Sequence, residues 1–369
     1  MNEKENTGQA KLLSTVINSG LCTGCGACVE LCPYMKIHNA KTIALFSCDL
    51  DTGRCFRYCP RAQTDFRDLK KQLFDEADLT DELGAFKGLY LTRAMNPKIQ
   101  EKAQHGGTVT ALVQLAMEEG MVKGCVLTDQ DENMLPRSFT AFDPSEILAA
   151  AGSKFGNAPV IAEFNRISAK RADNIGVVAT PCQARALAKM RGNPGIGDED
   201  RMSRLKLVIG LFCGWTLDFK KLNHIVRQEV KDTKIIAMDI PPSKYACMEI
   251  TTAQGIKKIP IETINDCARQ SCDYCTDMTA EFADISVGSA RSKDGWDIDK
   301  HWNQVIVRSD TGRLLLELAR EKGILEFKEV PEENVTRLKA VSLGKRTYGS
   351  KMLTQLHETR DVQEAGQCR

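Results

Sequence analysis

Apolar positions recur with clear periods from residue 86 onward, and their spacing predicts alternating strands and helices. Within 108–120, Val109, Leu112, Val113, Ala116 and Met117 lie three or four residues apart, which is typical of an amphipathic helix ending at Gly120. Short apolar runs bounded by polar turns predict strands. The predicted strands are 88–94, 123–129, 174–180, 204–214, 235–240, 244–251, 283–289 and 303–309, and further helices are 181–192, 217–230 and 312–323. This alternation predicts a mixed α/β body.

The segments around this body differ from it in pattern. Residues 1–66 are rich in cysteine and poor in regular periodicity, whereas 67–85 are charged and helix-prone and predict a linker helix. The body then divides into 86–170 and 171–330, and a basic helical tail follows over 331–369. The chain shows no internal repeat other than its paired cysteine motifs.

Composition narrows the class of protein. The 369 residues are 42% hydrophobic and 27% charged, as in an ordinary globular protein. The net charge of +1 gives no overall field that would recruit nucleic acid or an anionic membrane. The N-terminus lacks the apolar core of a signal peptide, and no apolar run reaches the roughly 20 residues that span a bilayer. We therefore expect a cytoplasmic protein without a membrane span.

Fifteen cysteines are the most unusual feature of the composition. A reducing cytoplasm disfavours a disulfide framework, so metal or redox chemistry is the expected use. Cys125 and Cys247 lie in apolar runs and are interpreted as core residues, while Cys368 lies in a polar tail and is interpreted as a free thiol. Twelve cysteines remain as candidate ligands.

The run CTGCGACVELCP places four of these cysteines at the spacing of bacterial ferredoxins, C-x2-C-x2-C-x3-C-P. The small residues between them allow backbone amides to face a cluster. Zinc is the main rival, but zinc sites use paired C-x2-C knuckles rather than four cysteines within eleven residues. The run predicts a [4Fe–4S] site and a small N-terminal ferredoxin-like domain; its cysteines are Cys22, Cys25, Cys28 and Cys32.

The second stretch, CDLDTGRCFRYCP, ends in a Cys-Pro pair like the first but has a different spacing. In the ligand exchange of two-cluster ferredoxins, its last cysteine would join the first cluster. The second cluster would then have three cysteines, giving a [3Fe–4S] centre or a [4Fe–4S] centre completed by Asp49, Asp51 or an outside ligand. A single cluster is the alternative. Under exchange the first set is Cys22, Cys25, Cys28 and Cys59, and the second is Cys32, Cys48 and Cys55.

The α/β body carries three further candidate features. A glycine pair, Gly106 and Gly107, opens the helix at 108, where close backbone approach and a helix N-terminus favour a phosphate. Cys182 follows a strand and begins a helix, a place that lowers a thiol pKa and suits a nucleophile or an iron ligand. The segment CARQSCDYC adds Cys267, Cys272 and Cys275, and Cys213 ends another predicted strand.

In order, GGTVTAL, AGSKFG, ATPCQARAL, IGLFCG, a C-x4-C-x2-C-T-D run and ADISVG resemble the β-subunit family of coenzyme F420-reducing hydrogenases and F420-dependent formate dehydrogenases. The resemblance covers residues 86–330 and implies an α/β fold with FAD and a [4Fe–4S] cluster in the body. It implies cluster ligands at Cys182, Cys213, Cys272 and Cys275, with Cys267 as the spare and a core role as the alternative for Cys213. It implies flavin contacts at Gly106, Gly107, Thr108, Thr110, Ser153, Lys154 and Thr180.

The resemblance also implies a function. A flavin exchanges a hydride with F420, and clusters pass single electrons to a catalytic subunit such as a hydrogenase or formate dehydrogenase, so we expect an electron-transfer subunit. The chain lacks a G-x-G-x-x-G strand-turn-helix, which weakens but does not exclude NAD(P)H as the two-electron carrier. Ferredoxin in place of F420, or an adaptor with clusters and no flavin, are the alternatives.

Overall fold

The computed structural model describes residues 8–131, 135–170, 172–241, 245–290 and 296–367. Eight of its strands form one sheet in the order β15-β5-β14-β13-β9-β8-β6-β7. These are β5 (Gly88–Ala94), β6 (Gly124–Gln130), β7 (Pro136–Ala141), β8 (Ile175–Ala179), β9 (Leu205–Leu211), β13 (Ile285–Ser289), β14 (Asn303–Val307) and β15 (Leu325–Lys328). The four central strands β13, β9, β8 and β6 run parallel, and antiparallel strands extend the sheet on both sides.

Helices cover both faces of this sheet, so that the fold is the expected mixed α/β body. Alternation along β6 shows the two faces directly, because Cys125 and Leu127 join one core while Val126 joins the other. The first core is closed by α4 (Pro97–Lys102), α5 (Thr108–Glu118), α6 (Pro144–Ala149) and α13 (Asp310–Glu321), and the second by α3 (Phe66–Leu73), α7 (Val160–Ala169), α8 (Pro181–Gly192) and α9 (Glu199–Ser203).

Two smaller units join the body. The N-terminal domain contains α1 (Gln9–Leu12), a π-helical turn (Leu13–Ile17), the hairpin of β1 (Met35–His38) and β2 (Lys41–Ala44), and α2 (Arg54–Arg57). A three-stranded meander, β10 (Ile235–Asp239), β11 (Cys247–Thr252) and β12 (Gly255–Pro260), packs with α10 (Phe219–Val230) and α11 (Ile261–Asn265). The helix α12 (Trp296–Asp299) lies between β13 and β14 in sequence.

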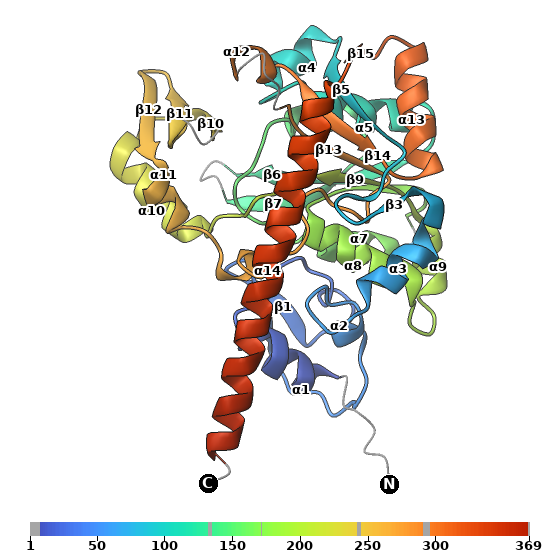
Figure 1. Cartoon of the computed structure of the whole chain (residues 1–369), viewed down its shortest axis with the longest axis vertical. Helices are drawn as coiled ribbons and strands as arrows, with labels where there is room; N and C mark the ends of the chain where they lie inside the picture. The colour runs from blue at the N-terminus through green and yellow to red at the C-terminus, as the bar shows by residue number, and fades with distance from the viewer. Residues whose placement is uncertain (1–7, 132–134, 171, 242–244, 291–295, 368–369) are drawn as a thin grey trace.

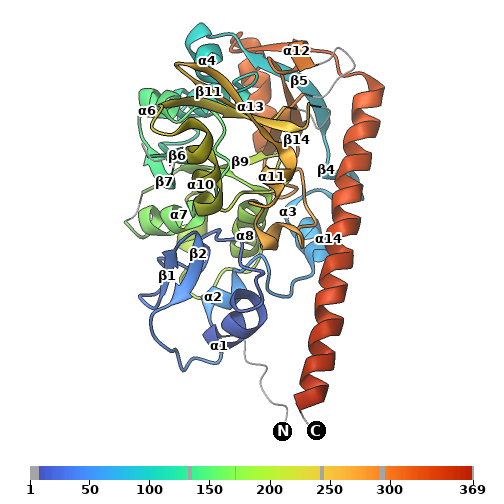
Figure 2. The ribbon, with the colours of Figure 1, turned by 90° about the vertical axis from the view of Figure 1, so that its left-hand side faces the viewer.

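The last helix, α14 (Glu332–Gln367), is the longest of those described. At 1.5 Å per residue it extends about 54 Å. Both views show it as the red helix that passes along the body and reaches the blue N-terminal domain (Figures 1 and 2). No helix among the described segments has both the length and the apolar composition of a bilayer span.

The structure changes several of the predicted elements. The linker helix expected over 67–85 occupies only Phe66–Leu73, because the chain then forms a 3-10 turn (Glu76–Asp78) and a short hairpin of β3 (Leu79–Thr80) and β4 (Gly84–Ala85). Among the elements of the body, the periodicity analysis also missed β7, β12, β15, α4 and α6, which are short, and α7, which has 10 residues. Cys125 and Cys247 are buried, as expected of core cysteines, and Cys368 lies outside the described residues.

Candidate functional site

The first group of cysteines, Cys22, Cys25, Cys28 and Cys59, lies at the junction of the N-terminal domain and the body. Burial raises the pKa of Cys25 well above its ordinary value, and the nearby charges of Cys182, Cys59 and Cys28 add to this shift. Burial also raises the pKa of Cys28, with Cys59 and Cys22 among its charged neighbours. Cys59 therefore faces the ferredoxin run, as the ligand-exchange arrangement requires.

Glycines fix the backbone around the first group. Gly24 and Gly26 have φ of 68° and 87°, a region that strongly favours glycine. A Cβ on Gly24 would lie 2.2 Å from the carbonyl oxygen of Ala40, and one on Gly26 would lie 2.7 Å from the amide nitrogen of Ala162. The small residues of the motif therefore serve both the turn and its close contact with α7.

The second group contains Cys32, Cys48 and Cys55. Burial raises the pKa of Cys55 to about 11, and the nearby charges of Cys32 and Cys48 contribute to the shift. Cys32 is exposed, so this group lies nearest the surface. Asp49 and Asp51, the sequence candidates for a fourth ligand, are also exposed.

The third group gathers four cysteines from separate parts of the body. Cys182 begins α8 directly after β8, Cys213 follows β9, and Cys272 and Cys275 lie in the loop before β13. Burial raises the pKa of Cys213 well above its usual value, and the charges of Cys272, Cys182 and Cys275 add to the shift, while that of Lys345 opposes it. The structure thus brings together the four cysteines that the resemblance favours.

Cys267 lies apart from this group. Its side chain is 0% exposed within the core of the α10–β12 unit, and its Sγ donates to the carbonyl of Thr263 at 3.8 Å. Burial raises the pKa of Cys267, and its charged neighbours are Lys221, Asp218 and Asp266 rather than thiols. The geometry favours the role of spare cysteine.

The predicted direction of the pKa shift at Cys182 was wrong. Its place at the start of a helix predicts a lowered pKa, but burial dominates and raises it, with further increases from Cys275 and Cys272. Thr180 opposes the shift, and its Oγ1 lies 3.3 Å from Sγ of Cys182. A half-buried thiol among other thiols suits a ligand, which a metal deprotonates, better than a free nucleophile.

The donor sets fit iron–sulfur clusters in kind and number. The described cysteines are all free. Among the described residues, no group of three or more His, Cys, Asp or Glu side chains is placed to bind a single metal ion. Four thiols in the first group and four in the third match the four-cysteine ligation of [4Fe–4S] clusters. The second group has only three thiols, so a fourth ligand for its cluster stays a prediction.

A cavity of 1280 Å³ lies where the parallel strands end. Carboxyl ends of neighbouring parallel strands meet at one edge of a sheet, where α/β proteins bind their ligands. Most of the predicted flavin contacts line this cavity: Gly107, Thr108, Thr110, Ser153, Lys154 and Thr180. Cys213 lines it as well, so the cavity opens onto the third cysteine group.

Two of the predicted flavin contacts have other partners. Gly106 is not among the residues that line the cavity, and a Cβ there would lie 2.8 Å from the carbonyl oxygen of Thr92. The ammonium of Lys154 donates to the carbonyls of Ala150, Ala151 and Gly152 at 2.5, 3.0 and 3.0 Å, at the end of α6. Burial lowers the pKa of Lys154 to about 8. Its donors therefore already stabilise a helix end, which the sequence did not indicate.

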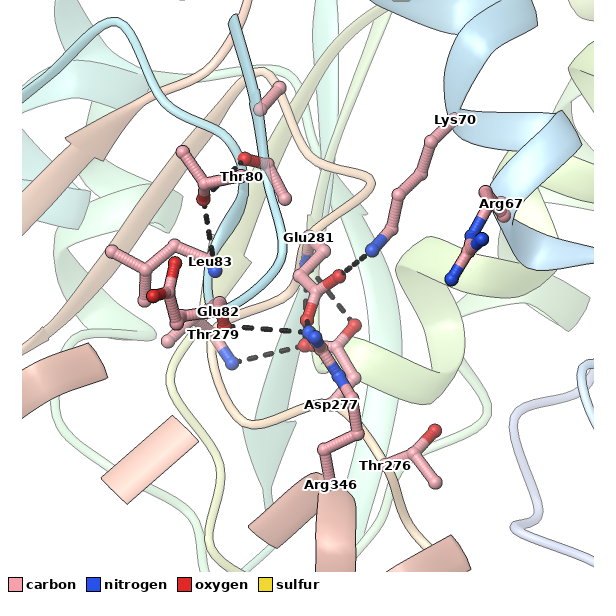
Figure 3. Close-up of polar contacts among 12 residues, drawn as sticks. Arg67, Lys70, Thr80, Glu82, Leu83, Thr276, Asp277, Thr279, Glu281 and Arg346 are labelled. Carbon is pink, nitrogen blue, oxygen red and sulfur yellow. Dashed lines mark hydrogen bonds and ion pairs between the residues drawn. The ribbon is translucent and has the colours of Figure 1, made fainter. Parts of the chain in front are cut away.

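The loop that carries Cys272 and Cys275 is held by buried charges that the sequence analysis also missed. The carboxylate of Asp277 accepts from the amides of Thr279 and Glu281 at 3.0 and 3.1 Å. Glu281, which is 0% exposed, pairs with Lys70 of α3 and Arg346 of α14 (Figure 3). One carboxylate thus joins the segment after Cys275 to α3 and to α14. No local sequence signal pairs residues so far apart.

The N-terminal domain is fixed to the body through the backbone of its cysteine loops. Asn157 donates to the carbonyl of Gly24 at 2.8 Å, and Lys189 donates to that of Cys59 at 2.7 Å. Arg61, which follows Cys59 in the N-terminal domain, donates to the carbonyl of Ser271 in the body at 2.6 Å. These contacts hold the first and third cysteine groups side by side.

Fold and site together define an iron–sulfur protein with an α/β body and a ligand cavity beside one of its cysteine groups. The chain belongs to the coenzyme F420 hydrogenase/dehydrogenase beta-subunit family. Residues 89–163 match the model for the N-terminal part of that subunit, and 172–333 match the model for its C-terminal part. Residues 15–35 match a 4Fe-4S binding domain, which contains the ferredoxin run.

Relatives and one solved structure agree with this assignment. The coenzyme F420 hydrogenase subunit beta of Methanothermobacter thermautotrophicus is 29% identical over 68% of this chain and 87% of its own length. One subunit of the F(420)H(2) dehydrogenase of Methanosarcina mazei is 26% identical over 87% of this chain and 88% of its own length. A chain of the F420-reducing [NiFe] hydrogenase complex from Methanosarcina barkeri has a TM-score of 0.68 and 24% identity, covering 75% of this chain and 94% of that one, and so shares its fold.

Proposed function

We propose that this chain is the FAD- and iron–sulfur-containing electron-transfer subunit of a multisubunit oxidoreductase. It exchanges a hydride between coenzyme F420, or a similar two-electron carrier, and FAD, and it transfers single electrons to or from a catalytic subunit of the hydrogenase or formate dehydrogenase type. The family and the names of its relatives support the carrier and the partner. A flavin supplies the conversion between two-electron and one-electron chemistry.

The observation that carries this proposal is the order of the sites. Cys213 lines the cavity and interacts with the third group, Cys182 of that group interacts with Cys25 of the first, and Cys28 of the first interacts with Cys55 of the second. The second group ends at the exposed Cys32. The three cysteine groups therefore form a series that leads from the cavity to the surface, which supports a path for electrons.

The residues of the chain have separate tasks in this scheme. The loop at Gly107 and the first turn of α5 form the wall against which a flavin would bind, and Thr180 continues that wall. The first cysteine group lies in the middle of this series and is shielded from solvent, because three of its members are buried: Cys25, Cys28 and Cys59. No side chain in the cavity is required to act as an acid or base for hydride exchange.

The direct test uses protein expressed and purified anaerobically. We expect FAD to be released on denaturation, and F420H2 to bleach both the flavin and the iron–sulfur absorption of the native protein. NADH and reduced ferredoxin are offered separately as alternative donors. Absence of flavin would contradict the flavoenzyme function and favour a clusters-only adaptor, while reduction by NADH alone would exclude F420 as the carrier.

A pair of glycines at the two ends of α5 provides a matched test of the flavin wall. Gly107 and Gly120 have φ of 73° and 69°, so alanine costs each about 1–2 kcal/mol. A Cβ on Gly107 would lie 2.7 Å from Cγ2 of Ile99, whereas one on Gly120 meets nothing within 4 Å. We expect Gly107→Ala to weaken flavin binding about tenfold, equivalent to 1.4 kcal/mol, and Gly120→Ala to leave it unchanged. Equal flavin contents would show that this loop does not bind the flavin.

A further inference from the structure

The N-terminal part of α14 forms a wall of the cavity that none of the predicted flavin contacts occupies. Glu333, Asn334, Arg337, Leu338 and Val341 line the cavity from this helix. Their spacing of three and four residues places them along one side of the helix. The family match ends at residue 333, so nearly all of this wall lies beyond the matched region.

The volume of the cavity leaves room for a second molecule beside a flavin. Sites for single ligands commonly measure about 300–1,000 Å³, and this cavity measures 1280 Å³. The predicted flavin contacts lie on α5, on the segment after α6 and at the start of α8. The wall formed by α14 is therefore available to a second molecule that binds next to the flavin and exchanges a hydride with it.

Asn334 is the residue that points to a ligand. Its side chain is 3% exposed, and its Nδ2 atom is buried without a hydrogen-bond partner among the described residues. A buried amide donor without an acceptor is unfavourable, so its presence in a cavity wall indicates an acceptor atom on a bound molecule. Its backbone amide is already satisfied by the carbonyl of Pro331 at 2.9 Å.

Arg337 adds a positive charge one turn further along α14. It is exposed to the cavity, and its guanidinium makes no ion pair with any described residue. A guanidinium suits bidentate recognition of phosphate or carboxylate. Glu333 precedes it by one turn and would repel an anion there, so the anionic part of the ligand is expected at Arg337.

We infer that Asn334 and Arg337 bind the anionic, phosphate-bearing two-electron carrier and so determine its affinity. This inference rests on the proposed function, because it assigns the remaining wall of the same cavity to the carrier. Asn334 donates to an acceptor on the carrier, and Arg337 pairs with its phosphate-bearing side chain. The C-terminal helix is then a ligand-binding element rather than only a tail.

The test measures binding of oxidised F420 to the anaerobically purified, flavin-loaded protein by calorimetry. Arg337→Ala is expected to raise the dissociation constant about tenfold or more, equivalent to 1.4 kcal/mol or more. Asn334→Asp keeps the shape of the side chain but replaces the donor with a charged acceptor, and is expected to weaken binding at least as much. Lys339→Ala is the matched control, because Lys339 lies on the same helix but faces Glu82, 4.0 Å away.

Two further arms separate the possible outcomes. The deazaflavin chromophore without its phosphate side chain should bind the wild type and Arg337→Ala equally, because it lacks the group that Arg337 recognises. Wild-type affinity for F420 in both variants would overturn the inference, although FAD content and reduction by F420H2 would still support the proposed function. Loss of FAD from Arg337→Ala with unchanged F420 affinity would also overturn it, by assigning the wall to the flavin.

Discussion

Replacing Cys272 with serine is expected to remove about four iron atoms, one [4Fe–4S] cluster, from the purified protein. Cys272 lies among the four thiols of the third group, where its Sγ accepts from the amide of Thr216 at 3.4 Å. Serine is nearly isosteric, so the loss would reflect the missing thiolate. We expect flavin to remain bound, because Cys272 is not among the residues that line the cavity.

The kinetic consequence of Cys272→Ser should be larger than its effect on iron content. The third group stands between the cavity and the first group, so its loss interrupts the series of sites. Reduction of the N-terminal iron–sulfur absorption by F420H2 should fall to the background rate, while reduction of the flavin itself continues. Stopped-flow absorbance under anaerobic conditions separates these two events.

Cys267→Ser is the matched control for this prediction. Cys267 belongs to the same nine-residue cysteine segment but lies buried in the α10–β12 core, away from the other thiols. Iron content and electron transfer should remain at wild-type values in this variant. If Cys267→Ser loses iron and Cys272→Ser does not, the grouping of the body cysteines is wrong.

Local patterns were sufficient for the main strands of the sheet and for the N-terminal cysteine run. The strand expected at 88–94 is β5 over the same residues, and the ferredoxin run lies within the residues that match a 4Fe-4S binding domain. Strand ends were less certain: the strand expected over 204–214 stops at Leu211, which leaves Cys213 in the loop beyond it. Hydrophobic period marks where a buried segment lies, whereas neighbouring strands and loops decide where it ends.

Tertiary contacts account for what the sequence did not reveal. Cys267 and Cys272 share one short segment, and only the packing of α10 and α11 separates their surroundings. The cavity wall at Asn334 was not foreseen, because a basic helical tail carries no signal of the surface on which it packs. Lys154 lines the cavity, but its ammonium lies close enough to the end of α6 to donate to the carbonyls there.

The buried carboxylate of Glu281 should contribute more to stability than a surface ion pair. Glu281→Gln leaves Lys70 and Arg346 without their shared partner, and breaking a buried pair in this way costs about 3–5 kcal/mol. The expected loss lies near the lower end of that range, because Glu281 also raises the pKa of Asp277, after the larger effect of burial, and its removal relieves this repulsion. Urea unfolding, followed by circular dichroism, measures the change in the free energy of unfolding.

A surface ion pair provides the control for Glu281. Arg93 and Glu326 lie 2.6 Å apart between β5 and β15, with both side chains more than a third exposed, so Glu326→Gln should cost less than about 1 kcal/mol. Equal effects of the two substitutions would contradict a special role for Glu281. Because Glu281 joins the segment after Cys275 to α3 and α14, its loss should also loosen the third cysteine group. We therefore expect Glu281→Gln to lose iron before the sheet unfolds as urea increases, whereas Glu326→Gln should lose both together.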